Sequence, residues 1–128
     1  MNISSISGLF GVAGQAGYSS GKAAIVGLTK TIAKEWGRLN VNVNVIAFGL
    51  IQTRLTQAIE ADQATIDIAG NQIKVGIQPQ TINAWIKTIP LGRAGAPEEA
   101  AGAVYLFCLP ESDYITGQVI VCSGGLSG

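Results

Sequence analysis

The sequence contains no histidine and only two cysteines, Cys108 and Cys122. A zinc site of the ordinary type needs more of these ligands, so we expect no metal. Any acid–base group must then come from tyrosine, lysine, aspartate, glutamate or cysteine. Two cysteines permit one disulfide, but free thiols in a reducing compartment are the better interpretation.

Charged side chains are also scarce, at 12% of the 128 residues, and soluble domains usually have about twice that share. Eight Lys and Arg residues balance eight Asp and Glu residues, and no basic footprint of a nucleic-acid-binding protein is present. Hydrophobic residues make up 48% of the chain, which excludes intrinsic disorder. We expect a single folded unit over 1–128 with no nucleic-acid partner.

No hydrophobic run is long enough to cross a membrane. Lys, Asn, Gly or Pro interrupts each run before it reaches the roughly 20 residues that a spanning helix needs. The first residues, MNISSISGLF, lack the positive charge that precedes the apolar part of a secretory signal. These absences predict a cytoplasmic protein without a membrane partner.

Seventeen glycines and four prolines divide the chain into short elements. The apolar patterns predict strands at 2–6, 41–48 and 118–122, helices at 18–37, 81–89 and 97–109, and one or two helical turns at 53–61. Strands that alternate with helices in this way indicate an α/β layered domain with a parallel sheet.

Each predicted helix has a recognisable end or face. Gly37 is placed to end the first helix, Thr81 to cap the second, and Pro97 to begin the third. The expected buried stripe of the first helix is Ile25, Leu28, Ile32 and Trp36. The expected buried stripe of the third helix is Ala100, Ala103, Val104 and Phe107.

Residues 65–77 follow a different pattern, in which five branched apolar residues alternate with polar ones. Gly70 and Asn71 lie in the middle, so the stretch predicts a β-hairpin with a two-residue turn at these positions. The hairpin is either an apolar-faced excursion on the surface or a lid over an apolar pocket. The pattern favours neither interpretation.

Tyr18 and Lys22 are the first residues that suggest chemistry. Their spacing places both side chains on one face of a helix, one turn apart. A lysine ammonium beside a phenol favours the phenolate, and such a tyrosine can exchange a proton with an alcohol or carbonyl oxygen. Ser4 and Ser5 end the preceding strand, where a hydroxyl can hold the same oxygen. Taken alone, Tyr-x-x-x-Lys is a weak motif, and serine pairs in loops are usually turn residues.

The spacing of these residues resembles the catalytic segment of the short-chain dehydrogenase/reductase family. Asn-x-Ser-Ser at 2–5 is followed, thirteen positions after Ser5, by Tyr-x-x-x-Lys at 18–22. Three further stretches are similar to the family in the same order: VNVNVIAFGLIQT at 41–53, IPLGRAGAPEEAAGAVYLFC at 89–108 and YITGQVIVCSGG at 114–125. Within the family, the resemblance is greatest to the 3-oxoacyl-carrier-protein reductases.

The resemblance implies a role for each matched residue. Ser5, Tyr18 and Lys22 would be the catalytic residues: Tyr18 would transfer the proton, Ser5 would orient the substrate oxygen, and Lys22 would also bind the nicotinamide ribose. Gly49, Ile51 and Thr53 would join Tyr18 and Lys22 in binding NAD or NADP. Ser5, Gln15 and Leu50 would bind the substrate, and 54–90 would form the lid or substrate region. The reaction implied is reversible hydride transfer between NAD(P) and a carbonyl or secondary alcohol, on 3-oxoacyl or similar apolar substrates.

The family's phosphate-binding sequence is absent. Neither Gly-x-x-x-Gly-x-Gly nor Gly-x-Gly-x-x-Gly occurs, although a dinucleotide fold needs such a turn after its first strand. The resemblance therefore implies the C-terminal half of a Rossmann-like, doubly wound parallel sheet. Its three strands would be neighbours, and the strand at 2–6 would be an open edge. Phe48 and Cys122-Ser123 also depart from the usual family residues.

Three functional alternatives follow. The chain is the catalytic half of an NAD(P)-dependent oxidoreductase, a truncated chain without activity, or one chain of a split enzyme that needs a partner for cofactor binding. The implied partners are a small carbonyl or alcohol substrate and either further copies in a homo-oligomer or the missing N-terminal half.

Overall fold

A computed structural model describes residues 1–53, 56, 65–68, 70–74 and 79–126. Its strands are β1 (Asn2–Ser5), β2 (Val45–Phe48), β3 (Thr65–Ile68), β4 (Asn71–Lys74) and β5 (Val119–Cys122). Its α-helices are α1 (Ser7–Phe10), α2 (Ala16–Trp36), α3 (Pro79–Thr88) and α4 (Pro97–Tyr105). Short 3₁₀ helices span Gly37–Leu39, Leu106–Cys108 and Pro110–Ser112.

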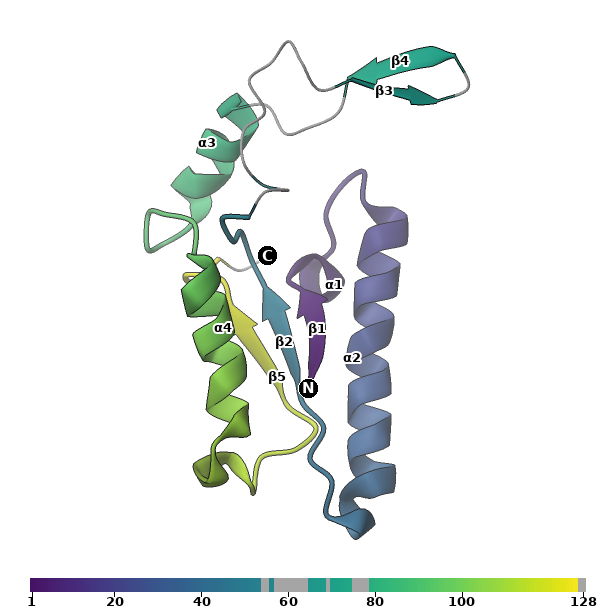
Figure 1. The fold of residues 1–128 in the computed structure, drawn as a ribbon, viewed down its shortest axis with the longest axis vertical. Coiled ribbons are helices and arrows are strands. Elements are labelled where there is room, and N and C mark those ends of the chain that lie inside the picture. Colours follow the sequence, from purple (N-terminus) through teal and green to yellow (C-terminus); the bar gives the residue numbers. More distant parts are fainter. Residues whose placement is uncertain (54–55, 57–64, 69, 75–78, 127–128) are drawn as a thin grey trace.

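The centre of the fold is a parallel sheet with strand order β1-β2-β5. Figure 1 shows the three strands side by side, and the two views together place α2 and α4 on opposite sides of the sheet. This arrangement confirms the predicted α/β class and the predicted adjacency of the three strands. In the middle strand, Val45, Ile46 and Ala47 are fully buried, as expected for a parallel strand covered on both faces.

The face of α2 that packs on the sheet differs from the predicted stripe. Leu28 is 54% exposed and Trp36 is 46% exposed, whereas Thr29 and Ala33 are buried. Thr29 makes this approach possible because its hydroxyl accepts a hydrogen bond from the side chain of Asn2 at 2.9 Å and donates to a carbonyl of its own helix. Of the predicted stripe, Ile25 and Ile32 are half-buried, while the fully covered positions of α2 carry the small Ala33 and the hydrogen-bonded Thr29.

The α-helix α2 ends at Trp36 with Gly37 as its C-cap, as predicted. The chain then continues as a 3₁₀ helix, and the residue with left-handed backbone is Asn40, with φ of 60°. Asn tolerates this conformation better than most residues. One helix start was predicted wrongly: α3 begins at Pro79, so Thr81 lies inside the helix and does not cap it. Pro97 begins α4 as predicted.

The predicted hairpin exists, as β3 and β4 pair antiparallel. Ile68 is the partner of Asn71, so Asn71 belongs to β4 and is not a turn residue as predicted. The second half of the alternating pattern, at 75–77, and most of the helical turns predicted at 53–61 lie outside the described residues. None of the described helices is both long and apolar enough to cross a membrane.

The short helix α1 lies directly against α2. A Cβ atom added to Gly8 would lie 2.6 Å from the backbone carbonyl carbon of Lys22 and 2.7 Å from its Cβ. Only a residue without a side chain permits this contact, which sets the start of α2 against the end of β1.

Gly8→Ala is expected to lower the free energy of unfolding by about 1–3 kcal/mol, because the added methyl group overpacks this contact. Gly21→Ala is the matched control, since its Cβ would meet nothing within 4 Å. That change is expected to raise the stability by about 0.5–1 kcal/mol through helix propensity. Urea unfolding followed by circular dichroism measures both. Equal midpoints for the two variants would contradict the close approach of α1 to α2.

Candidate active site

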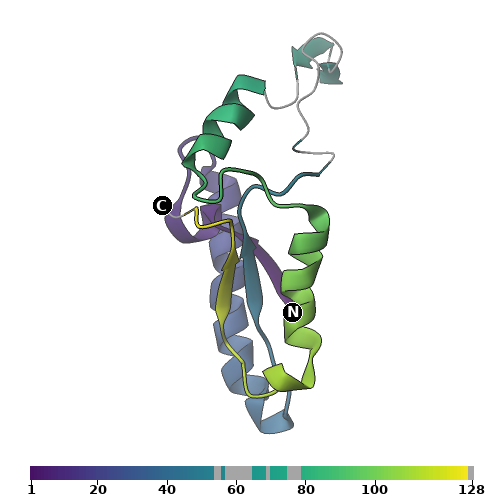
Figure 2. The same ribbon diagram turned by 90° about the vertical axis from the view of Figure 1, so that its left-hand side faces the viewer.

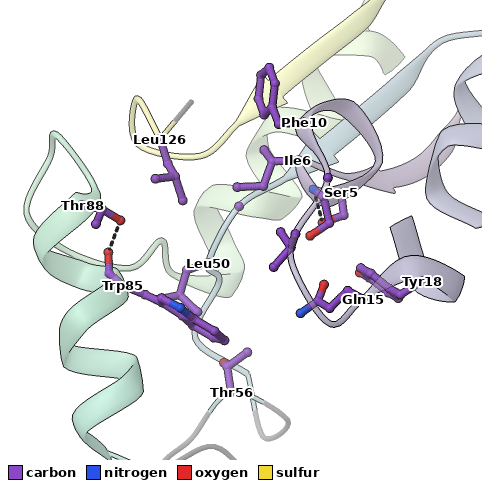
Figure 3. A pocket seen from close by; sticks show the side chains of 14 residues that line it. Ser5, Ile6, Phe10, Gln15, Tyr18, Leu50, Thr56, Trp85, Thr88 and Leu126 are labelled. Carbon is purple, nitrogen blue, oxygen red and sulfur yellow. Dashed lines mark hydrogen bonds between the residues drawn. The ribbon is translucent and has the colours of Figure 1, made fainter. Parts of the chain in front are cut away.

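A cleft of about 670 Å³ opens at the carboxyl ends of β1 and β2. Its walls come from the end of β1, from α1 and the loop after it, from the start of α2, from the segment after β2, from α3 and from Leu126 (Figure 3). Ligand sites in parallel α/β sheets are found at this edge, because loops from neighbouring strands meet there. The volume lies within the range of roughly 300–1,000 Å³ that small-molecule sites occupy.

The two serines at the end of β1 have different roles. Ser4 points toward α2, and its hydroxyl donates to the backbone carbonyl of Lys22 at 2.8 Å. Ser5 is buried in the wall of the cleft, where its Oγ accepts the N–H of Ser7 at 3.2 Å. With Oγ as acceptor in that bond, the Ser5 hydroxyl retains its own hydrogen as a donor. The alternation of side chains along β1 therefore selects Ser5 as the serine that faces a ligand.

Tyr18 lines the cleft from the first turn of α2 and is 52% exposed. One turn later, Lys22 places its Nζ 5.7 Å from the centre of the Tyr18 ring, within the range of a cation–π contact. The same ammonium group donates to the backbone carbonyl of Ile3 at 3.3 Å. Lys22 thus lies behind Tyr18, between the ring and β1, and does not line the cleft itself.

The end of β2 leads into the cleft through Gly49 and Leu50. The N–H of Gly49 donates to the carbonyl of Cys122 at 3.0 Å, and a Cβ on Gly49 would lie 2.8 Å from the Cβ of Ser123. Glycine is required here because β2 and β5 converge too closely for any side chain.

Ile51 and Thr53 come next along the chain after Leu50, and neither lines the cleft. Ile51 forms an isolated parallel bridge with Gly95, in which the N–H of Gly95 donates to the Leu50 carbonyl and the N–H of Gln52 donates to the Gly95 carbonyl. The Ile51 N–H faces the other way and has no partner among the described residues. The Thr53 N–H donates to the Thr56 hydroxyl at 2.7 Å.

The structure therefore brings five of the predicted site residues into one cleft: Ser5, Gln15, Tyr18, Gly49 and Leu50. Lys22, Ile51 and Thr53 lie outside its lining. Much of the lining was not predicted residue by residue, namely Ile6, Phe10, Val12, Trp85, Thr88 and Leu126, although Trp85 and Thr88 lie in the region 54–90 that was expected to cover the substrate. The sequence did contain a signal for Trp85. It is a large aromatic residue on a short amphipathic helix after the hairpin, and such a residue is expected to pack against the body of the domain or to line a cleft.

An ion pair supports the loop that carries Gly95. The guanidinium of Arg93 donates to both carboxylate oxygens of Glu99, at 2.6 and 2.7 Å, and the Ala96 N–H donates to the same carboxylate at 2.8 Å. These bonds lower the pKa of Glu99 to about 2, and the bonds from Arg93 have the largest effect. Arg93 therefore organises the turn before α4 and does not face the cleft.

Both cysteines are free thiols, as expected. Burial, and to a lesser degree the charge of Glu99, raises the pKa of Cys122, so its reactive thiolate form is disfavoured. Among the residues that the structure describes, no group of three His, Cys, Asp or Glu side chains is placed to hold a metal ion.

Comparison with known proteins identifies the family. A family model described as "Enoyl-(Acyl carrier protein) reductase" matches residues 1–127. The chain belongs to the short-chain dehydrogenase/reductase family. It is 40% identical over 127 residues to the 3-oxoacyl-(acyl-carrier-protein) reductase FabG of Chlamydia muridarum. It is 38% identical over 127 residues to the protein of the same name from Thermotoga maritima, and 40% identical over 126 residues to Carbonyl reductase family member 4 of Danio rerio.

The matches cover nearly all of this chain but less than half of each relative. They extend over 99% of this chain and 44% of the Chlamydia protein, and over 98% and 44% for the Thermotoga protein. The Danio protein is matched over 98% of this chain and 44% of its own length. With its three-stranded parallel sheet, the chain forms part of a Rossmann-like fold.

The Glu99 carboxyl is expected to titrate with a pKa of about 2, and Arg93→Gln is expected to move that pKa up toward 4.5. Since the folded-state pKa is the lower one, the stabilisation from this carboxylate is complete above the unfolded pKa and is lost as pH falls toward 2. NMR titration of the Glu99 carboxyl carbon measures the pKa. The same value in both proteins would show that the Arg93 bonds do not form.

Proposed function

We propose that this chain is the catalytic half of an NAD(P)-dependent oxidoreductase, which transfers a hydride between a nicotinamide and a carbonyl or secondary alcohol. The observation that supports this most strongly is the meeting of Ser5 and Tyr18 in one cleft, with the Lys22 ammonium against the Tyr18 ring. The relatives with reductase names support the same class of reaction.

Each of the three side chains has one task in this proposal. The Ser5 hydroxyl, whose hydrogen is not used in its bond to Ser7, donates to the substrate oxygen and orients it. The Tyr18 hydroxyl gives a proton to that oxygen during reduction and takes it back during oxidation. The Lys22 ammonium stabilises the phenolate that forms when the proton leaves. When bound, the nicotinamide supplies or accepts the hydride.

The residues present fit one end of the cofactor. Ile51 has a backbone N–H that is turned away from its bridge to Gly95 and can donate to a carboxamide. Gly49 has no side chain to block a flat ring at the end of β2, and Lys22 and Thr53 carry groups that hydrogen-bond a ribose or a carboxamide. The pyrophosphate end has no counterpart, since the glycine-rich turn does not occur in the sequence. NAD and NADP remain equal alternatives in the proposal.

The substrate proposal is a 3-oxoacyl compound or a similar apolar carbonyl. Two observations support it: the names of the relatives, and the apolar side chains, such as Phe10 and Leu126, that form much of the cleft lining. The region 54–90 is proposed to cover this substrate, and of its described residues Thr56 and the α3 residues Trp85 and Thr88 line the cleft.

A second half is needed to complete the sheet in this proposal. Among the described strands, β1 pairs with β2 alone, which leaves its other edge without a partner strand there, and Ile3 on β1 is exposed. Parallel sheets are normally covered on both faces. We propose that a phosphate-binding half, on the same or another polypeptide, pairs with β1. The exposed apolar residues Leu28 and Trp36 on α2 support association into a homo-oligomer.

The second candidate function is that of a chain without activity, and the missing phosphate turn favours it. The 128-residue chain alone is expected to show no saturable binding of NADPH, because it lacks the glycine-rich turn that would hold the pyrophosphate. Joining it to the part of the Thermotoga relative that it does not match is expected to restore saturable binding. Cofactor fluorescence measures both. Saturable binding by the chain alone would contradict the need for a second half, and failure of the fusion would favour the inactive chain.

Tyr18→Phe is expected to reduce turnover to background in any form of the protein that reduces carbonyls, because the proton donor is removed while the ring remains. Tyr114→Phe is the matched control, since Tyr114 is fully exposed and lies outside the cleft lining. Its turnover should equal that of the unmodified protein in a coupled assay of NADPH oxidation. Retained activity in Tyr18→Phe would refute the catalytic assignment.

A further inference from the structure

We propose that Trp85 is a specificity-determining residue, and that its indole ring holds the uncharged, apolar chain of the substrate against the wall opposite Ser5 and Tyr18. The inference rests on the proposed function and adds to it the residue that selects the substrate by chain length and charge.

The polar groups of the cleft that can hold a ligand oxygen lie on one side of it, and apolar side chains make up most of the rest of the lining. Figure 3 shows Ser5, Gln15 and Tyr18 on one side, with Leu50, Trp85 and Leu126 across from them. The polar groups suffice to hold one carbonyl oxygen. The opposite wall is mostly apolar, because its two hydroxyls already donate to backbone carbonyls, that of Thr88 to Trp85 and that of Thr56 to Ile51. A compound with a carbonyl at one end and a hydrocarbon chain at the other matches both walls.

Charge is missing from this lining. Of the described residues that line the cleft, none carries an ionisable carboxylate, ammonium or guanidinium group. A charged substituent on the ligand would lose its water without gaining a partner among them, which is costly. The described lining therefore favours an uncharged ketone over a carboxylate of equal length.

The position of Trp85 is set by the sheet. Ile89, one helical turn later, is 3% exposed, and its Cγ2 lies 2.8 Å from where a Cβ on Gly124 would be. The N–H of Leu91 donates to the Gly124 carbonyl at 3.1 Å. The carboxyl end of α3 is thus attached to the segment that follows β5, and this attachment directs Trp85 into the cleft.

The indole ring is only partly covered by protein. Trp85 is 37% exposed, although aromatic side chains gain most from full burial. An apolar ligand chain would cover the part of the ring that faces the cleft. Leu50 lies beside the ring in Figure 3 and extends the same apolar surface.

Binding can be measured without turnover, because the chain has only two tryptophans. Trp36→Phe removes the one on α2, outside the cleft lining, and leaves Trp85 as the sole tryptophan. Excitation at the red edge of the tryptophan band then reports on Trp85 without exciting the tyrosines. Titration with 2-nonanone is expected to produce a saturable blue shift of its emission. Acetone, which lacks the hydrocarbon chain, is expected to produce no saturable change. The same is expected of nonanoate, which has the chain but carries a negative charge. No shift with 2-nonanone, or an equal response to nonanoate, would overturn the inference.

Specificity is then measured in the form of the protein that turns over ketones. Trp85→Ala is expected to lower kcat/KM for 2-nonanone about tenfold, as loss of several apolar contacts does, with little change for acetone. Trp85→Phe is expected to retain most of the preference for the longer ketone, and Trp36→Phe all of it. An equal loss on both ketones in Trp85→Ala would show a merely structural role and overturn the inference.

The two proposals fail separately. If no form of the protein reduces a ketone but 2-nonanone still shifts the Trp85 emission, the proposed reaction is wrong and the assignment of Trp85 to ligand binding holds. If ketones are reduced but neither substitution of Trp85 changes the preference for chain length, the reaction holds and the assignment of Trp85 is wrong.

Discussion

The site depends on how the start of α2 is held against the end of β1. The Ser4 hydroxyl bonds the Lys22 carbonyl, and Gly8 allows α1 to touch the backbone of the same residue. These contacts fix one turn of helix, and Tyr18 lies one turn before Lys22. Ser5 is the next residue after Ser4 and points to the opposite face of the sheet. The distance between the two side chains that face a ligand is therefore set by backbone packing and not by a direct bond between them.

A second constraint arises where the strands converge. Gly49 and Ser123, which follow β2 and β5, lie so close that any side chain on Gly49 would collide with Ser123. The segment after β2 is further held by its bridge to Gly95, and the Arg93–Glu99 ion pair orders the loop from which Gly95 comes. An exposed ion pair of this kind adds little stability by itself. The ion pair matters here for geometry, because it holds the Gly95 loop to which the segment after β2 is bridged.

The arrangement of strands and helices could be predicted because it depends on patterns that are local in sequence. The alternation around Val45, the proline at the start of α4 and the spacing from Ser5 to Tyr18 are all visible without a structure. The packing face of α2 could not be predicted from hydrophobicity, since Thr29 is buried through hydrogen bonds while Leu28 is not. The apolar wall was missed for another reason. Trp85 and Leu126 are far apart in sequence and meet only because Gly124 anchors the end of α3.

The order of pairing in the sheet has a consequence for how the chain folds. The central strand contacts residues near both ends of the described chain, as Val45 has Asn2 and Val119 as its partners. Both ladders are long-range, and closing such loops costs entropy before any contact compensates for it. Folding dominated by distant pairings is slow. During synthesis, β1, α2 and β2 are made before β5, so β2 keeps one edge unpaired until β5 has been made.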